Sequence, residues 1–291
     1  MPALPKILVT GANGQLGTEI HELSAAYPAY EWIFCTREQM PLDDEKTCID
    51  FLAATQPQFV VNCAAYTAVD KAELPEEKDS LFAINATTVK AIAAFCKDNN
   101  TRFIHISTDY VFAGTGSVPY KETDPTDPVN IYGASKLAGE QYITAVNSDA
   151  VIIRTAWVYS RYGKNFVKTM LRLMLEKTAI SVVNDQIGTP TYAADLAQAI
   201  ITIINTAEWH PGIYHFSNEG IISWFNFAVA IKELSNSNCT VNAIPTTSFP
   251  TPAKRPAYSV LDKTKIKTTF GIHINDWRES LAVCLQKMQN N

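Results

Sequence analysis

A tyrosine and a lysine four positions apart form the residue pair with the clearest chemical meaning in this sequence. Tyr132 and Lys136 stand in the segment Tyr-Gly-Ala-Ser-Lys at the start of a predicted helix, and a spacing of four puts both side chains on one helical face. The pKa of a free tyrosine is about 10, and a neighbouring ammonium group lowers it by stabilising the tyrosinate. The pair therefore predicts that Tyr132 donates a proton near neutral pH.

A hydroxyl group comes before this pair, at the end of a predicted strand. Thr108 and Asp109 follow the β-rich run at 102–107, and the carboxyl ends of strands in an α/β sheet face the ligand crevice. We expect the Thr108 hydroxyl to meet the same substrate carbonyl as Tyr132. A Tyr-x-x-x-Lys motif alone occurs often by chance, so its placement after such a strand is what supports a catalytic role.

Three glycines follow the first predicted strand at once. Gly11, Gly14 and Gly17 are spaced as Gly-x-x-Gly-x-x-Gly between the run at 6–10 and a predicted helix at 15–26. A tight turn and the close approach of a pyrophosphate to the backbone both select glycine, and a helix N-terminus favours negative charge. The segment predicts a dinucleotide site, while the alternative is a strand-to-helix turn that holds no ligand.

The end of the second predicted strand bears on which nicotinamide cofactor is used. An Asp or Glu there would hydrogen-bond the ribose 2′-hydroxyl and favour NAD, but the sequence has Thr36 and Arg37. Both could hold a 2′-phosphate, which favours NADPH and leaves NADH possible. The alternative is that Arg37 is a solvated surface residue. Asp43 comes a few residues later, where its carboxylate could accept a hydrogen bond from the adenine amino group.

These residues need a scaffold that brings strand ends together, and the first 155 residues alternate strands with helices. We expect strands at 6–10, 32–36, 59–63, 102–107 and 150–155 and helices at 15–26, 45–55, 80–97 and 132–146. Such alternation indicates βαβ units, and their right-handed crossovers give a doubly wound parallel sheet of the Rossmann type. The expected fold class is therefore α/β.

The second half of the chain is less regular and predicts a smaller C-terminal cap that binds substrate. Helices are expected at 164–177, 193–206, 223–235 and 274–289, a strand at 213–216, and prolines interrupt the stretch 245–256. We assign residues 1–158 to a dinucleotide-binding domain that also uses parts of 191–212, and residues 159–291 mostly to the interwoven cap. The aromatic run at 224–227 is expected to pack within a cap helix, with a base-stacking platform as the alternative.

The composition argues against several other classes of protein. Hydrophobic residues make up 47% and charged residues 18% of the 291-residue chain, which is the balance of a globular protein. A formal net charge of −5 argues against a nucleic-acid partner. No apolar stretch approaches the roughly 20 residues that span a bilayer, and the N-terminus lacks a secretory signal, so we expect a cytoplasmic protein without a membrane partner. Six cysteines without Cys-x-x-Cys spacing and five unclustered histidines predict no metal site.

Several motifs together resemble the extended short-chain dehydrogenase/reductase family. They are TGANGQLG at 10–17, VNCAAYTAVDKAE at 61–73, STDYVF at 107–112 and NIYGASK at 130–136. The resemblance extends over nearly the whole chain, toward members that reduce a 4-keto sugar nucleotide, through RTAWVY at 154–159, NFV at 165–167, DQIGTPT at 185–191 and RPAYSVLD at 255–262. It implies hydride transfer from NADPH or NADH to the C4 carbonyl of a 4-keto-6-deoxy sugar nucleotide.

The resemblance also implies roles for individual residues. Tyr132 is expected to be the proton donor, Lys136 to bind the nicotinamide ribose and lower the pKa of Tyr132, and Thr108 to hydrogen-bond the C4 oxygen. Together with the residues proposed above, the expected cofactor site comprises Gly11, Asn13, Gly14, Gln15, Leu16, Gly17, Arg37, Asp43, Ala64, Ala65, Tyr66, Thr67, Tyr132 and Lys136. The expected substrate site comprises Thr108, Asp109, Trp157, Asn165 and Arg255.

Two other functions stay open at this point. Sugar-nucleotide dehydratases and epimerases share the expected fold. A dehydratase of this family is expected to carry a Thr-Asp-Glu signature, but this chain has Tyr110 after Asp109. A non-catalytic regulatory subunit of methionine adenosyltransferase also resembles these reductases, and the intact Tyr132, Lys136 and Thr108 argue against that function. Some family members dimerise through acidic residues that bind magnesium near the C-terminus. Residues 285–291 contain no carboxylate side chain, so we expect a monomer or a different homodimer.

Overall fold

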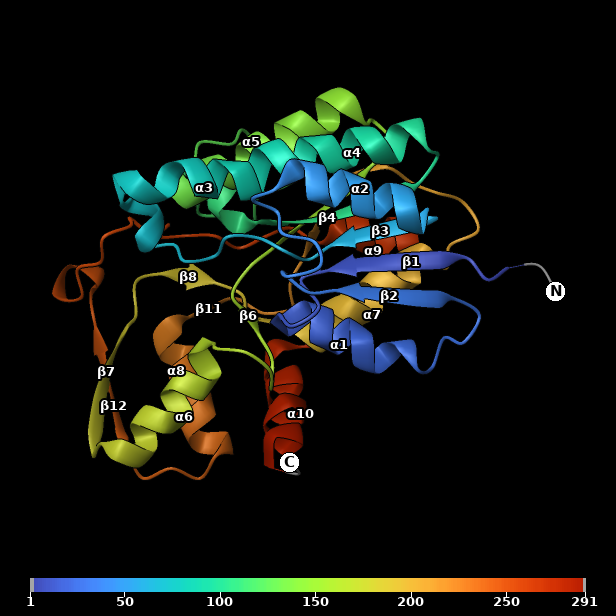
Figure 1. Ribbon diagram of the computed structural model, residues 1–291. Coiled ribbons are helices and arrows are strands. Elements are labelled where there is room, and N and C mark those ends of the chain that lie inside the picture. Colours follow the sequence, from blue (N-terminus) through green and yellow to red (C-terminus); the bar gives the residue numbers. More distant parts are fainter. Residues whose placement is uncertain (1–2, 290–291) are drawn as a thin grey trace.

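A parallel sheet forms the centre of the computed structural model, which describes residues 3–289 (Figure 1). Its strands lie in the order β10-β5-β4-β3-β1-β2, and neighbouring strands are parallel. They are β1 (Lys6–Thr10), β2 (Glu31–Cys35), β3 (Phe59–Asn62), β4 (Arg102–Thr108), β5 (Val151–Thr155) and β10 (Gly212–Phe216). Because the strands are parallel, their carboxyl ends meet at one edge, where most of the predicted site residues follow β1, β3 and β4.

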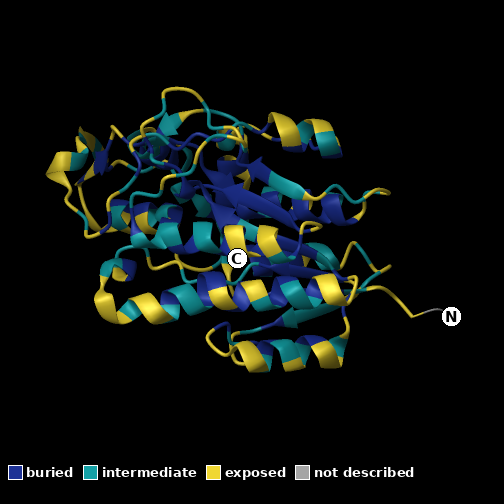
Figure 2. Cartoon of the chain, turned by 90° about the horizontal axis from the view of Figure 1, so that it is seen from above, coloured by how far each residue is buried: buried dark blue, intermediate teal, exposed yellow. Residues whose placement is uncertain are grey.

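Helices cover both faces of this sheet. One face carries α1 (Gln15–Ser24), α7 (Ala193–Ile204) and α9 (Thr264–Phe270), and the other carries α2 (Glu45–Thr55), α3 (Lys78–Phe82), α4 (Thr88–Asp98) and α5 (Ile131–Val146). Apolar side chains of the strands meet the apolar stripes of these helices in a separate core on each face. Figure 2 shows the central strands mostly buried and the outer helix faces exposed. The doubly wound α/β fold predicted from the sequence is confirmed.

The helix expected at 80–97 is interrupted in the structure. A π-helical turn at Ala83–Thr87 separates α3 from α4. Within it, the Asn85 amide accepts a hydrogen bond from the Tyr66 backbone N–H and donates one to the Tyr66 carbonyl. Gly139 on α5 permits this close packing, because a Cβ there would lie 2.2 Å from the Asn85 carbonyl oxygen. The irregular turn therefore fixes the loop after β3, as such turns often do near functional sites.

The second half of the chain builds the smaller cap and also returns to the sheet. The cap helices α6 (Phe166–Glu176), α8 (Trp224–Leu234) and α10 (Trp277–Gln289) surround one apolar cluster. Three short strand pairs accompany them: β7 (Ala179–Val183) with β12 (Thr240–Ile244), β8 (Ile187–Gly188) with β11 (Ile222–Ser223), and β6 (Val158–Tyr159) with β9 (Thr191–Tyr192). Short 3₁₀ turns lie at Lys71–Glu73, Pro75–Glu77, Asp109–Val111 and Thr246–Ser248. The elements α7, β10 and α9 belong to the sheet layer, so the chain crosses between the two parts more than once.

The cap differs more from expectation than the sheet does. The strands β7 and β12 and the helix α9 are not predicted by the sequence. No residue of strand β12 is fully buried, so the strand shows neither an apolar run nor a buried face, and it forms by pairing with β7. Among the helices within residues 3–289, none combines the length and the apolar character needed to cross a membrane.

Candidate active site

A cavity of about 950 Å³ opens at the carboxyl edge of the sheet. Its walls come from the loops after β1, β3, β4 and β5, from the start of α5 and from the cap. The predicted residues that line it are Gly11, Asn13, Gly14, Gln15, Leu16, Arg37, Ala64, Ala65, Tyr66, Thr67, Thr108, Asp109, Tyr132, Lys136 and Trp157. The predicted residues outside the lining are Gly17, Asp43, Asn165 and Arg255.

The turn after β1 has the shape of a phosphate-binding loop. Gly11 has a φ of +67°, and a Cβ at this residue would lie 2.9 Å from the Ala64 backbone nitrogen. Gly14 is the N-cap of α1 and places no side chain over the free N–H groups of the first turn. A Cβ at Gly17 would lie 2.3 Å from the Gly11 carbonyl oxygen, so Gly17 supports the turn by close packing. The cradle and the open N–H groups fit a pyrophosphate.

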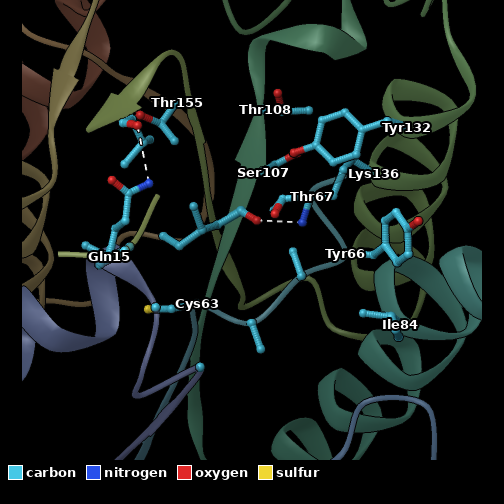
Figure 3. Close-up of a pocket in the computed structure, with 18 of the residues that line it drawn as sticks. Gln15, Cys63, Tyr66, Thr67, Ile84, Ser107, Thr108, Tyr132, Lys136 and Thr155 are labelled. Atoms are coloured by element: carbon cyan, nitrogen blue, oxygen red, sulfur yellow. Dashed lines mark hydrogen bonds between the residues drawn. The ribbon is translucent and has the colours of Figure 1, made fainter. Parts of the chain in front are cut away.

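Tyr132, Lys136 and Thr108 come together in the cavity (Figure 3). Burial raises the pKa of Tyr132 to about 12, and the neighbouring Thr108 hydroxyl acts in the opposite direction. Lys136 Nζ donates a hydrogen bond to the Ile106 carbonyl oxygen over 2.7 Å and lies 3.0 Å from His105 Nε2. The expected lowering of the Tyr132 pKa by Lys136 stays a prediction, since in this arrangement burial of the phenol dominates and the amine faces β4. A phenol with a raised pKa holds its proton at neutral pH, as a donor must.

Charged groups behind the cavity act on Lys136. Burial lowers the pKa of Lys136 to about 8, and Glu140, one turn further along α5, opposes that shift. Glu140 forms a buried ion pair with Arg154 on β5 at 2.6 Å and accepts a hydrogen bond from the Ser107 hydroxyl. Tyr132, Lys136 and Glu140 therefore follow one face of α5 at a spacing of four. The sequence analysis misses Glu140, although this spacing is a signal that could have found it.

The end of β4 holds the two side chains expected to face the substrate. The Thr108 hydroxyl donates to Asp109 Oδ1 over 3.0 Å and accepts from the Tyr110 backbone N–H over 3.2 Å. Burial raises the pKa of Asp109 to about 6. Tyr110 packs edge-on against Tyr132, with ring centroids 5.9 Å apart. These contacts fix Thr108 and Asp109 beside the phenol of the proposed proton donor.

Two tryptophans form part of the wall on the cap side of the cavity. Trp157 stacks on Trp224, with ring centroids 3.6 Å apart and planes inclined by 12°, and both line the cavity. Trp157 has a φ of +48°, which is rare for a bulky residue. A Cβ at Gly188 would lie 2.7 Å from the Trp157 ring, so the glycine makes room for it. Trp224 thus lines the cavity, where the sequence analysis favours packing within a cap helix and keeps a stacking platform as the alternative, whereas Phe227 is buried in the cap as expected.

The family model described as RmlD substrate binding domain matches residues 5–290. The chain belongs to this family. It is similar to the spore coat polysaccharide biosynthesis protein SpsK of Bacillus subtilis, with 44% identity over 98% of each chain. Among solved structures it is similar to a dTDP-4-dehydrorhamnose reductase of Clostridium acetobutylicum, with 40% identity, a TM-score of 0.93 and coverage of 98% of this chain and 99% of that one. It is also similar to the dTDP-4-dehydrorhamnose reductase of Bacillus anthracis in complex with NADP, with 37% identity, a TM-score of 0.92 and coverage of 98% and 100%.

In this member of the RmlD family, two expected cofactor residues pair with each other at the rim of the cavity. Arg37 Nη2 lies 2.9 Å from Asp43 Oδ2, and the two side chains are 75% and 41% exposed. Arg37 lines the cavity, and Asp43 does not. Exposed ion pairs of this kind are weak, so the pair leaves Arg37 able to turn toward a phosphate. The expected roles of both residues stay predictions.

Two expected substrate residues of this RmlD-family chain are engaged elsewhere. The Asn165 side chain caps α6 and donates to Gln15 Oε1 over 2.9 Å and to the Ser160 carbonyl over 2.6 Å. Arg255 forms a two-pronged ion pair with Asp70, and both N–O distances are 2.8 Å. Neither side chain lines the cavity, because each is held by other residues of the same chain. Asn165 instead fastens the loop before α6 to the phosphate loop.

Several other lining residues are missed by the sequence analysis. Ser107 directly precedes Thr108 in the STDYVF motif, so its place at the strand end is a readable signal. Lys164 comes from the loop that Asn165 fastens, and no local pattern predicts that it reaches the cavity. The remaining ones are Glu38, Met40, Leu42, Cys63, Val69, Ile84, Ile106, Tyr110, Thr155, Val158, Gly163 and Leu196. Within the described part of the chain, no group of three or more His, Cys, Asp or Glu residues could hold a metal ion.

Proposed function

We propose that this chain reduces the C4 keto group of dTDP-4-dehydro-6-deoxy-L-mannose with NADPH and forms dTDP-L-rhamnose, the reaction of a dTDP-4-dehydrorhamnose reductase. The observation that carries the proposal is the meeting of Tyr132, Lys136 and Thr108 in one cavity with a glycine-rich phosphate loop. Similarity over almost the full length to reductases of this name, one of them solved with NADP, supports both the reaction and the cofactor.

The residues of the cavity fit a nicotinamide dinucleotide. When bound, NADPH supplies the hydride that the C4 carbonyl accepts. The cradle at Gly11, which a Cβ would fill, and the open N–H groups at the start of α1 suit the pyrophosphate. Lys136 would donate to the nicotinamide ribose, and Arg37 would face a 2′-phosphate. The residues that complete this surface are Asn13, Gly14, Gln15, Leu16, Ala64, Ala65, Tyr66 and Thr67.

The protein's own contribution to the chemistry is a proton and a hydrogen bond. Negative charge develops on the sugar O4 during reduction, and Tyr132 delivers a proton to that oxygen. Thr108 donates a hydrogen bond to the same oxygen, for which its hydroxyl turns away from Asp109 Oδ1. Asp109 then has an oxygen free to accept from a sugar hydroxyl. Donors aimed at developing charge stabilise the transition state more than the ground state.

The test is NADPH oxidation by the purified chain with dTDP-4-dehydro-6-deoxy-L-mannose. We expect one dTDP-L-rhamnose for each NADPH consumed, and no oxidation without the sugar nucleotide. If the chain reduces only a different 4-keto-6-deoxy sugar nucleotide, that compound would take the place of the proposed substrate. Water loss or epimerisation without net NADPH consumption would favour a dehydratase or an epimerase. NADPH binding with no reduction across the whole panel would favour a non-catalytic nucleotide-binding role.

Three further parts of the proposal concern partners and place. We propose that NADPH is preferred and that NADH is a weaker alternative. A monomer or a homodimer stays a prediction, and sedimentation of the purified chain checks it. A cytoplasmic location also stays a prediction, which cell fractionation checks.

A further inference from the structure

A row of polar side chains crosses the interior of the sheet next to the cavity. Thr10 on β1, Asn62 on β3 and His105 on β4 are partners in the strand register, and each is at most 1% exposed. Thr10 Oγ1 lies 2.6 Å from the Asn62 side-chain amide, which in turn lies 3.0 Å from His105 Nδ1. The row ends at Lys136, whose Nζ lies 3.0 Å from His105 Nε2.

The other end of the row reaches the backbone that would hold the cofactor. Thr10 directly precedes Gly11, and its hydroxyl oxygen accepts a hydrogen bond from the Ala64 N–H over 3.2 Å. Gly11 and Ala64 pack closely against each other, and both line the cavity. Three buried side chains therefore connect the amine of Lys136 to the phosphate loop.

Packing alone does not account for this row. Burying polar side chains costs free energy unless each finds a partner, and the adjacent residues on the same strands include the fully buried Val9, Val61 and Ile104. Apolar side chains would fill the same space without that cost. What the row adds is a hydrogen-bonding group at Lys136 Nζ.

His105 can serve Lys136 in either charge state of the amine. Burial, together with the charge of Lys136, holds the pKa of His105 well below its usual value, so the ring is neutral, with one nitrogen that donates and one that accepts. An ammonium group needs Nε2 as an acceptor, whereas an uncharged amine can accept from an Nε2–H. Thr10 donates to Asn62 Oδ1 in the structure, which suits the uncharged amine. A half-turn of the Asn62 amide exchanges its oxygen and nitrogen and suits the ammonium group.

We propose that His105 is a positioning residue that holds Lys136 Nζ in place whether the amine is charged or not. The proposal rests on the proposed reduction, in which Lys136 binds the cofactor beside the proton donor. A charged donor makes a stronger hydrogen bond than a neutral one. Loss of His105 Nε2 therefore removes more stabilisation from the ammonium form of Lys136 than from the amine form, and the pKa of Lys136 falls.

Other groups around Lys136 stay unchanged in this comparison. Glu140 faces it from α5 and is paired with Arg154 of β5. Tyr132 lies one turn before Lys136 on the same helix. The π-helical turn packed against α5 presents the uncharged Asn85, whose amide donates to Ser135 Oγ. A change in the titration of Lys136 on replacement of His105 is therefore attributable to the lost hydrogen bond.

Three replacements separate the two nitrogens of His105. A glutamine reaches Lys136 with its terminal amide, an asparagine ends where Nδ1 lies and reaches only Asn62, and a phenylalanine keeps the ring without either nitrogen. We expect His105→Gln to keep kcat within about threefold of wild type. We expect His105→Asn and His105→Phe to lose about tenfold in kcat, and the basic limb of their pH profile to move down by about one pH unit.

NADPH binding, followed by cofactor fluorescence over the same pH range, gives a readout that needs no turnover. As the pH is raised, we expect the NADPH affinity of His105→Asn to start falling at a lower pH than the affinity of the wild type. Wild-type protein that binds NADPH but reduces no sugar nucleotide would reject the proposed function and leave this titration to test His105. An unshifted limb in His105→Asn, or equal losses in His105→Gln and His105→Asn, would overturn the proposal. If these variants fail to fold, Thr10→Val removes the hydroxyl at the far end with little change of shape, and a smaller shift in the same direction is expected.

Discussion

The sheet side and the cap side of the cavity hold their residues by different means. On the sheet side, single elements bring Tyr132, Lys136 and Thr108 to the cavity, by a helical spacing of four and a strand end, and contacts with β4 then hold the Lys136 amine. On the cap side, Asn165 and Arg255 do not line the cavity. They bind the side chains of Gln15 and Asp70, which lie 150 and 185 positions away in the same chain. A side chain placed by its own element can be predicted from the sequence. A side chain placed by contacts between distant segments cannot.

The largest expected effect is on the sheet side, at Tyr132. Tyr132→Phe keeps the ring and removes the hydroxyl that delivers the proton. General acid catalysis supplies about 10²–10⁴ in rate, and we expect kcat to fall by about that factor. NADPH and sugar-nucleotide affinity should stay close to wild type, because the lost interaction is strongest in the transition state. Steady-state kinetics and a cofactor binding titration check both parts.

Two outcomes would break this assignment. If Tyr132→Phe retains more than about a tenth of the wild-type kcat with chemistry rate-limiting, the proton comes from another group. If cofactor binding falls together with kcat, the phenol has a structural role in the cavity. Thr108→Val is the matched variant, because it removes only the second hydroxyl at the sugar oxygen and should lower kcat less than Tyr132→Phe.

The next effect tests whether the cap side contacts substrate through its stacked tryptophans. We expect Trp157→Ala to raise KM for the sugar nucleotide about tenfold, because it removes an aromatic face that lines the cavity. NADPH affinity should change little. Trp224→Ala removes the other ring of the stack and should raise KM in the same direction. Equal losses of cofactor and substrate affinity would instead assign Trp157 to the structure of the cap.

The extent of correct prediction follows the same division between local and distant contacts. The strand at 6–10 and its glycines are readable because a buried strand and the turn after it are contiguous, and Gly11 has the positive φ that such a turn requires. The row Thr10, Asn62 and His105 could not be predicted, because it depends on the register between three strands. Strand β12 could not be predicted either. Its residues show no strand pattern of their own, and its regular structure comes from pairing with β7.

A smaller effect is expected at Asn165, where the two sides of the cavity are joined. Asn165→Ser keeps a side chain that can cap α6 but is too short to reach Gln15. We expect it to weaken NADPH binding about threefold while the melting temperature stays near wild type, because the loop before α6 is released from the phosphate loop. Asn165→Ala loses the cap as well and should lower the melting temperature by about 2–4 °C. A rise in KM for the sugar nucleotide with unchanged NADPH binding would instead support the role in substrate binding that the sequence analysis expects for Asn165.

The smallest expected effect is at the rim, where Arg37 is exposed and paired with Asp43. The Arg37 side chain is fixed neither by its own helix or strand, as on the sheet side, nor by a buried contact with a distant segment, as on the cap side. Arg37→Ala should weaken NADPH binding about twofold and leave NADH binding unchanged, because only NADPH carries the 2′-phosphate that a rim cation can meet. Asp43→Asn is the matched control, since it frees Arg37 from its ion pair and should strengthen NADPH binding if the pair competes with the phosphate. Both differences should shrink as salt is added, because exposed charges are screened. Equal effects of Arg37→Ala on the two cofactors would make Arg37 a surface residue and leave the cofactor preference to the backbone around it.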